Sequence, residues 1–357
     1  MFTLFLPGSA QGLAAPLTVT TMTATIAAGF MLARYAGSRL RAAARERVHD
    51  FEYCLGQFVA GHTRGRKLLF QASRLEPDDF WESVSSLATH LTRRAFRDVE
   101  QALERSRHVG AERRALIDGP PLRRELAARR LANLGAARHR HALRRALVAG
   151  PEPVTLAAGT ALARIRDGAT LRWLLEHPSA LEHRTPVARF GLLRAFGRGA
   201  APRLHAALVQ KLSEPRMERA VIEALAAADR REAADLIASR LGHPWRDVRV
   251  AAARALGRLG AGEHRAGLVA ALEDSDWRVR SQAARSLGRL SAREAIPALG
   301  RTLSDASWWV RRHSAYALAA LGEEGQRALR EAAAAHTDRY ARDIAAEALA
   351  GGFPPRR

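Results

Sequence analysis

The feature that most constrains the fold is an internal repeat of 31 residues in the C-terminal half of this 357-residue chain. Four segments align without gaps, at 247–257, 278–288, 309–319 and 340–350. The same position of each segment holds a leucine, namely Leu256, Leu287, Leu318 and Leu349. Looser copies place Leu131, Leu162 and, after a spacing of 34, Phe196 in this frame, so the array begins near residue 120. One such unit cannot bury its apolar faces alone, and neighbouring copies must therefore stack.

Each copy predicts two helices. Residues 295–303 have apolar side chains at helical spacing and a proline in the first turn, where proline is tolerated. Residues 304–307 then break and cap the chain, and a second helix begins near Trp308. Its buried stripe is predicted to be Val310, Ser314, Ala315, Leu318 and Leu321. The sequence therefore predicts an all-α solenoid of stacked helical hairpins.

One copy carries nearly all the residues of a known repeat pattern. They are Asp276, Val279-Arg280, Ala283-Ala284, Ser286-Leu287-Gly288, Leu290 and Ile296-Pro297-Ala298-Leu299. This pattern resembles the short, 31-residue class of HEAT repeats, also called PBS-lyase-like repeats. The resemblance covers roughly residues 120–350 and implies an α-α superhelix that binds or scaffolds other proteins.

The N-terminus predicts a membrane anchor. Residues 1–33 carry no charged side chain, and a helix over residues 13–33 is about 30 Å long, enough to cross a bilayer. Five arginines follow between Arg34 and Arg47, which places the C-terminal part in the cytoplasm by the positive-inside rule. We therefore expect a single-pass protein of the inner or plasma membrane. The alternative is an apolar helix that packs on a soluble domain.

These features divide the chain into four parts. They are a transmembrane anchor at 1–35, a juxtamembrane helical neck or pair of degenerate repeats at 36–119, the HEAT-repeat solenoid at 120–350 and a short tail at 351–357. Gly119-Pro120-Pro121 marks the break before the array. Within the neck, amphipathic helices are expected between Asp79 and Arg107.

The formal charge of +21 predicts an acidic partner. The excess is spread along the polar part of the chain instead of forming one basic patch, which favours an acidic protein over nucleic acid. Nucleic-acid binding stays as the alternative function. Only Lys67 and Lys211 are lysines, so a compositional bias toward arginine explains the charge equally well.

The exposed face of the second helices is the predicted partner-binding surface, because in HEAT arrays that face lines the concave side. Guanidinium groups there offer paired hydrogen bonds to carboxylate or phosphate. Glu223 and Glu347 occupy the same column in flanking copies. The alternative is a merely solvated face. The predicted binding residues are Arg254, Arg258, Gln282, Arg285, Arg289, His313 and Tyr316.

A second set of arginines recurs once per repeat, as Arg249, Arg280, Arg311 and Arg342. The resemblance implies that this arginine pairs with an acidic residue in the turn between helices. Asp247, Asp274, Asp276 and Asp305 lie suitably near in sequence. We interpret these arginines as structural, against the alternative of a basic stripe for phosphate or carboxylate.

Four tryptophans lie at the turns, namely Trp245, Trp277, Trp308 and Trp309. Our interpretation is that they seal the seams between repeats. The alternative is that they stack on nucleic-acid bases.

No catalytic residues, metal ligands or cofactor are predicted. Cys54 is the one cysteine, so zinc ligation is disfavoured. No histidine precedes a glutamate, which removes the reading as a deoxyhypusine hydroxylase, an enzyme of similar repeats. A bilin-lyase-like enzyme is a distant third alternative. The sequence thus predicts a membrane-anchored cytoplasmic scaffold or adaptor that binds a protein partner with an acidic surface.

Overall fold

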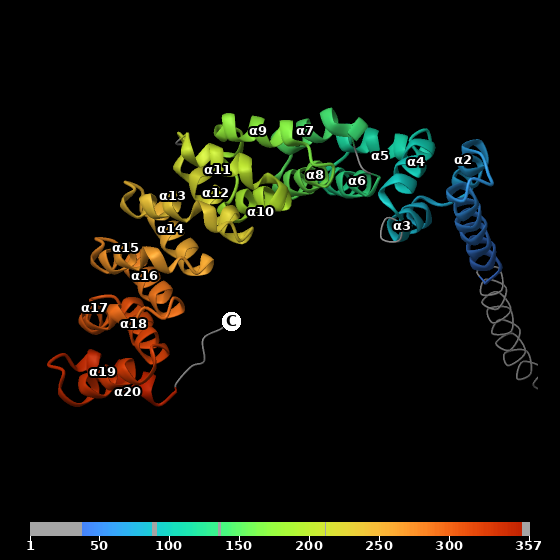
Figure 1. The fold of residues 1–357 in the computed structure, drawn as a ribbon. Helices are drawn as coiled ribbons and strands as arrows, with labels where there is room; N and C mark the ends of the chain where they lie inside the picture. Colours follow the sequence, from blue (N-terminus) through green and yellow to red (C-terminus); the bar gives the residue numbers. More distant parts are fainter. Residues whose placement is uncertain (1–37, 88–90, 135–136, 211, 352–357) are drawn as a thin grey trace, which may run out of the picture. The chain divides into compact units, whose positions relative to one another are not determined.

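The computed structural model describes residues 38–87, 91–134, 137–210 and 212–351 (Figure 1). All regular secondary structure within these ranges is helical, which confirms the predicted all-α fold. The chain forms two compact units, Met1–Glu112 and Arg113–Arg357.

Unit 1 has a small aromatic core. The ring centroids of Phe51 and Phe80 are 5.9 Å apart, and the His108 ring stacks on Phe80 at 4.5 Å. Nε2 of His108 lies 3.0 Å from the carbonyl oxygen of Ala72. Cys54 is buried beside this core, and burial raises the pKa of its thiol. The helical segments are residues 38–59, α2 (Gly65–Ser73), α3 (Pro77–Leu87), α4 (Arg93–Leu103) and the start of α5 (Arg107–Asp118).

The amphipathic helices expected between Asp79 and Arg107 are α3 and α4. Phe80 and Val84 of α3 and Val99 of α4 are buried, as their helical spacing indicates. Helix α3 begins with acidic residues in its first turn, where the helix dipole favours negative charge.

Unit 2 is a succession of helical hairpins. Its α-helices are α6 (Pro121–Asn133), α7 (Arg140–Ala149), α8 (Glu152–Arg164), α9 (Gly168–Glu176), α10 (Pro186–Ala195), α11 (Ala201–Val209), α12 (Pro215–Ala227), α13 (Ala234–Ala238), α14 (Arg246–Leu259), α15 (Arg265–Ala270), α16 (Trp277–Arg289), α17 (Ile296–Arg301), α18 (Trp308–Ala320), α19 (Gly322–Ala335) and α20 (Arg339–Leu349). Short 3-10 helices flank them at η1 (Ala137–His139), η2 (Pro178–Leu181), η3 (Arg198–Ala200), η4 (Arg231–Ala233), η5 (Ser239–Gly242), η6 (Gly262–His264), η7 (Ala271–Glu273), η8 (Arg293–Ala295) and η9 (Thr302–Ser304).

The hairpins build two layers. The even-numbered helices from α6 to α20 are the second helices, and each packs beside the next. The odd-numbered helices form the other layer, and within unit 2 the second helices lie on the inner side (Figure 1). The break expected at Gly119-Pro120-Pro121 coincides with the end of α5 and the start of α6.

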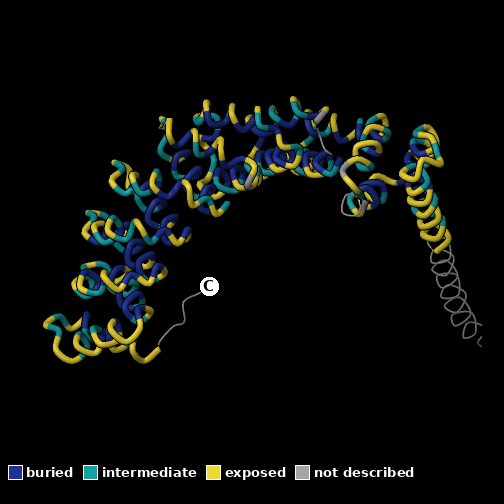
Figure 2. Tube along the Cα trace, viewed as in Figure 1, coloured by how far each residue is buried: buried dark blue, intermediate teal, exposed yellow. Residues whose placement is uncertain are grey.

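The core of unit 2 lies between the two layers, where the buried segments follow one another (Figure 2). The predicted stripe of α18 is buried throughout. At the repeated leucine position, burial is complete until the last helix, where Leu349 is 38% exposed. The fully buried members are Leu131, Leu162, Leu225, Leu256, Leu287 and Leu318.

The ends of the second helices also follow the 31-residue frame. Asp229, Gly260, Ser291 and Gly322 each lie just after a second helix, and each has a positive φ between 50° and 76°. A residue in this left-handed conformation commonly terminates a helix. Glycine adopts it without strain, whereas Asp229 and Ser291 bear a side chain there.

No helix in the described ranges combines the length and the apolar character that a bilayer span requires. The predicted anchor at residues 13–33 lies outside the described residues.

Candidate partner-binding surface

Four arginines gather on two neighbouring second helices. Arg254 and Arg258 lie on α14, and Arg285 and Arg289 lie on α16. Residues four apart share one face of a helix, and α14 packs against α16. All four side chains are exposed. We call these four residues the arginine surface.

The arginine surface is largely uncompensated. Nη1 of Arg254 lies 3.5 Å from Oε1 of Glu223 on α12. For Arg258, Arg285 and Arg289, no carboxylate of the described residues lies within ion-pair distance. Partial burial lowers the pKa of Arg289, and the neighbouring arginines lower it further. The guanidinium groups therefore repel one another, and an anion bound among them would relieve that repulsion.

Gln282 was predicted on this exposed surface, and that prediction is wrong. Its side chain is only 8% exposed, and its Nε2 donates to Oγ of Ser286 at 3.3 Å. Ser286 in turn donates to the carbonyl oxygen of Ala253 at 2.8 Å. Gln282 thus lies at the seam between α14 and α16. The exposed strip is narrower than helical spacing suggested.

His313 also lies at a seam. Its Nδ1 is 2.6 Å from Oγ of Ser281, which joins α18 to α16. Burial lowers the pKa of His313, and Arg285 and Arg312 lower it further. The ring is therefore a neutral, half-buried contact near the arginine surface instead of an exposed cation.

Tyr316 lies half-buried on α18, one helix beyond Arg285. Its hydroxyl donates to Oε1 of Glu347 at 3.5 Å, and the guanidinium of Arg312 lies 5.4 Å from its ring centroid. Burial raises the pKa of the Tyr316 hydroxyl. At neutral pH this position therefore offers an uncharged hydroxyl.

Arg249 and Arg280 tie neighbouring repeats together. Nε and Nη2 of Arg249 donate to Asp274 at 2.7 and 2.8 Å, and the same atoms of Arg280 donate to Asp305 at 2.7 and 2.9 Å. Nη1 of each arginine donates to two carbonyls of the turn before its own helix. Each guanidinium therefore joins two successive turns, which is the pairing that the resemblance implies.

Burial alone would raise the pKa values of Asp274 and Asp305. The hydrogen bonds from arginine and from a backbone N–H outweigh it, so both pKa values are lowered. The two carboxylates are consequently charged at neutral pH, and they belong to the fold.

Arg311 and Arg342 keep only the second half of this arrangement. Each donates through Nη1 to two carbonyls of its own turn. Where Arg249 and Arg280 find an aspartate 25 residues later, Arg311 finds His336. The guanidinium of Arg311 lies instead over the ring of Tyr340, 5.1 Å from its centroid.

The same spacing continues upstream with altered chemistry, which the sequence analysis missed. Nη1 of Arg189 lies 3.7 Å from Glu214, 25 residues later. In the next copy the charges are exchanged, with Glu218 3.4 Å from His243 and 2.6 Å from the buried Arg240. A search for opposite charges 25 residues apart would have found both pairs.

The tryptophans do not seal the seams as predicted. Trp245, Trp308 and Trp309 are 54%, 41% and 48% exposed. The Trp308 and Trp309 rings meet edge to face at 4.8 Å, and Arg312 lies over the Trp308 ring at 4.9 Å. Two of the four tryptophans thus form an exposed aromatic patch at the start of α18.

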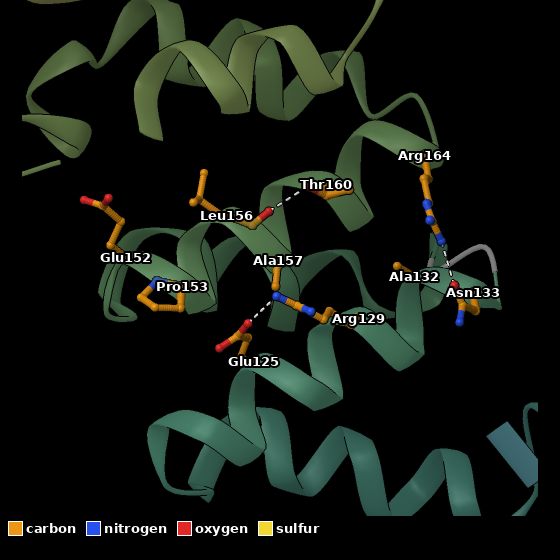
Figure 3. A pocket seen from close by; sticks show the side chains of 10 residues that line it. All are labelled: Glu125, Arg129, Ala132, Asn133, Glu152, Pro153, Leu156, Ala157, Thr160 and Arg164. Atoms are coloured by element: carbon orange, nitrogen blue, oxygen red, sulfur yellow. Dashed lines mark hydrogen bonds and ion pairs between the residues drawn. The ribbon is translucent and has the colours of Figure 1, made fainter. Parts of the chain in front are cut away.

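A separate pocket of about 610 Å³ lies between α6 and α8 (Figure 3). Leu156 and Ala157 supply apolar walls, while ion pairing of Arg129 with Glu125 and the hydrogen bond of Arg164 to Asn133 at 2.6 Å engage the charged groups. Its charges are therefore internally balanced, unlike those of the arginine surface.

Within the described ranges, no three metal-binding side chains come together.

The comparisons with known proteins agree with a HEAT solenoid in the C-terminal part of the chain. The sequence model of the HEAT-repeat family matches residues 265–350, which contain α15 to α20. No curated protein sequence matches this chain significantly.

Several solved structures share the solenoid fold at low identity. The CpcE–CpcF complex of phycocyanin lyase from Nostoc sp. PCC7120 is 22% identical over 69% of this chain and 94% of that chain, with a TM-score of 0.32. Human deoxyhypusine hydroxylase is 21% identical over 79% of this chain and 98% of that one, with a TM-score of 0.31. Kap121p bound to Nup53p is 13% identical over 85% of this chain and 41% of that one, with a TM-score of 0.43.

Proposed function

We propose that this protein is a scaffold or adaptor that binds an acidic segment of a partner protein at the arginine surface. The observation that carries the proposal is the exposure of four arginines on α14 and α16, three of them without a carboxylate partner in the part of the chain that is described. Arginine–carboxylate hydrogen bonds are strong and geometrically specific. An acidic segment would therefore satisfy donors that the fold leaves open.

The test is a charge reversal with a matched control. In the first variant, Arg254, Arg285 and Arg289 are changed to glutamate. In the control, Arg293, Arg301 and Arg327 are changed to glutamate; these exposed arginines belong to η8, α17 and α19. Both variants lose the same net charge, so a difference between them reports the location of binding.

The probe is a fluorescent glutamate-rich peptide, and its affinity is measured by fluorescence anisotropy. We expect the arginine-surface variant to lose binding and the control to keep most of it, with both retaining the helical circular dichroism of the parent. Equal loss in both variants would show that only the overall charge matters, and the proposal would then fail. A single-stranded oligonucleotide, whose binding weakens steeply with salt, tests the nucleic-acid alternative.

We further propose that residues 13–33 anchor this scaffold in the inner or plasma membrane, with the solenoid in the cytoplasm. The support is in the sequence: an uncharged stretch followed by arginines between Arg34 and Arg47. The full-length protein should stay in the membrane pellet at high salt and be released by detergent. Recovery of the full-length protein in the high-salt supernatant would contradict the anchor.

A further inference from the structure

The arginine surface is part of a longer row of side chains that crosses five helices. The ninth residue of each second helix from α12 to α20 stands in this row. In order they are Glu223, Arg254, Arg285, Tyr316 and Glu347. Positive charge therefore occupies the middle of the row, and a carboxylate stands at each end. We call this set the charge row.

The contacts within the charge row make its centre and its ends different. At one end Glu223 accepts from Nε of Arg219 at 3.2 Å and lies 3.5 Å from Arg254. At the other end Glu347 accepts from the Tyr316 hydroxyl at 3.5 Å. Arg285, in the centre, has no carboxylate within ion-pair distance among the described residues and is exposed.

A second row supports the same polarity. One turn further along each helix stand Ala227, Arg258, Arg289 and Ala320. The arginines of this row again lie on α14 and α16 alone. The two central helices thus concentrate four positive charges, whereas α12 and α20 contribute a carboxylate each and α18 an uncharged hydroxyl.

The spacing of the helices sets the length scale. Packed helices lie about 8–10 Å apart, and an extended chain rises about 3.3 Å per residue. An extended peptide that crosses the second helices therefore advances about three residues from one helix to the next. Its side chains can meet successive members of the charge row at that interval.

We propose that the partner segment is an extended peptide with an ordered charge pattern: two acidic residues about three positions apart, and basic residues outside them. The acidic pair meets Arg254 and Arg285. The basic residues meet Glu223, about three positions beyond one acid, and Glu347, about six beyond the other. This inference rests on the proposed function and adds the order of charges by which the partner is selected.

The test uses two synthetic peptides of identical composition and net charge. In the ordered peptide, two central glutamates are flanked by lysines at the stated spacings. In the exchanged peptide, the glutamates and lysines trade places. Each is made in both chain directions, because the row does not fix the polarity of the bound chain. We expect the ordered peptide to bind about tenfold or more tightly than the exchanged one, since like charges placed together oppose binding.

A double variant identifies the residues that read the order. Glu223→Gln with Glu347→Gln removes the terminal charges, and the preference for the ordered peptide should shrink severalfold. The control is Glu263→Gln with Glu294→Gln, two exposed glutamates of η6 and η8, and it should keep the preference. An unchanged preference in the Glu223 and Glu347 variant would overturn the assignment to these residues.

The outcomes separate this inference from the proposed function. Equal binding of the ordered and exchanged peptides would overturn the charge order, while loss of that binding in the arginine-surface variant would still support an acidic partner. Failure of the ordered, exchanged and glutamate-rich peptides to bind would overturn both. Tighter binding of a single-stranded oligonucleotide than of the ordered peptide would also overturn both.

Discussion

Arginines five residues apart on one helix have different roles in this protein. Arg280 is mostly buried, with 17% of its side chain exposed, and its donors are taken by Asp305 and by two turn carbonyls. Arg285 is exposed and has no carboxylate partner in the described ranges. The difference arises from the direction each side chain takes from α16, toward the inter-repeat turn or toward solvent.

The lowered pKa of Asp305 makes a prediction about acid stability. Because its folded-state pKa lies below that of an unfolded aspartate, the ion pair's contribution is complete above about pH 4 and is lost as the pH falls through the folded pKa. Asp305→Asn should cost about 1–3 kcal/mol of unfolding free energy at neutral pH, because it leaves Arg280 without its carboxylate. The variant should also lose less stability on acidification than the parent.

Urea unfolding at neutral and acidic pH measures both effects. The exposed pair partner Asp343, with 66% of its side chain exposed, supplies the control Asp343→Asn. That control should match the parent at both pH values. If Asp305→Asn also matches the parent, the ion pair has no role in stability.

At the scale of the helix, glycine marks where two elements come closest. A Cβ at Gly288 would lie 2.9 Å from Cα and 3.0 Å from Cβ of Ala317, so α16 and α18 touch through their backbones there. Gly288→Ala should therefore destabilise the protein by about 1–3 kcal/mol through overpacking. Thermal unfolding provides the measurement.

Gly300 is the matched position without a neighbour. It lies in α17, and nothing stands within 4 Å of where its Cβ would be. Gly300→Ala should leave stability unchanged or raise it by up to about 1 kcal/mol, because alanine favours the helix. Equal destabilisation by both changes would contradict the close approach at Gly288.

The helices of the C-terminal repeats could be predicted from the sequence because their period is regular. The second helix expected near Trp308 is α18, and its five predicted stripe residues are buried. Gln282 and the tryptophans could not be placed in this way. Their burial depends on how far a neighbouring helix covers each edge, and helical spacing alone does not contain that angle.

At the scale of the whole unit, stability should depend on position along the array. Leu287 is fully buried between neighbours, whereas Leu349, on the last helix, is 38% exposed. Leu287→Ala should cost about 2–5 kcal/mol, and Leu349→Ala clearly less. Denaturant unfolding compares them, and equal losses would contradict a stack held together by nearest neighbours.

The partner surface could be predicted only in part at this scale. The arginines of α14 and α16 are placed by the repeat frame, and the structure brings them onto neighbouring helices. The compensation of each charge was not visible in the sequence, since it depends on side chains in the next copy. Glu223 reaches Arg254, while no carboxylate of the described residues reaches Arg258.

The most direct test of the account is the affinity of Arg285→Ala for the ordered acidic peptide, measured at a temperature at which the variant is folded. We predict a large loss of affinity with an unchanged melting temperature, because Arg285 is exposed and has no structural partner among the described residues. Arg280→Ala, as the control, should lower the melting temperature and keep the affinity wherever it remains folded. An Arg285→Ala protein that binds the peptide as tightly as the parent would contradict the claim that the arginine surface binds the partner.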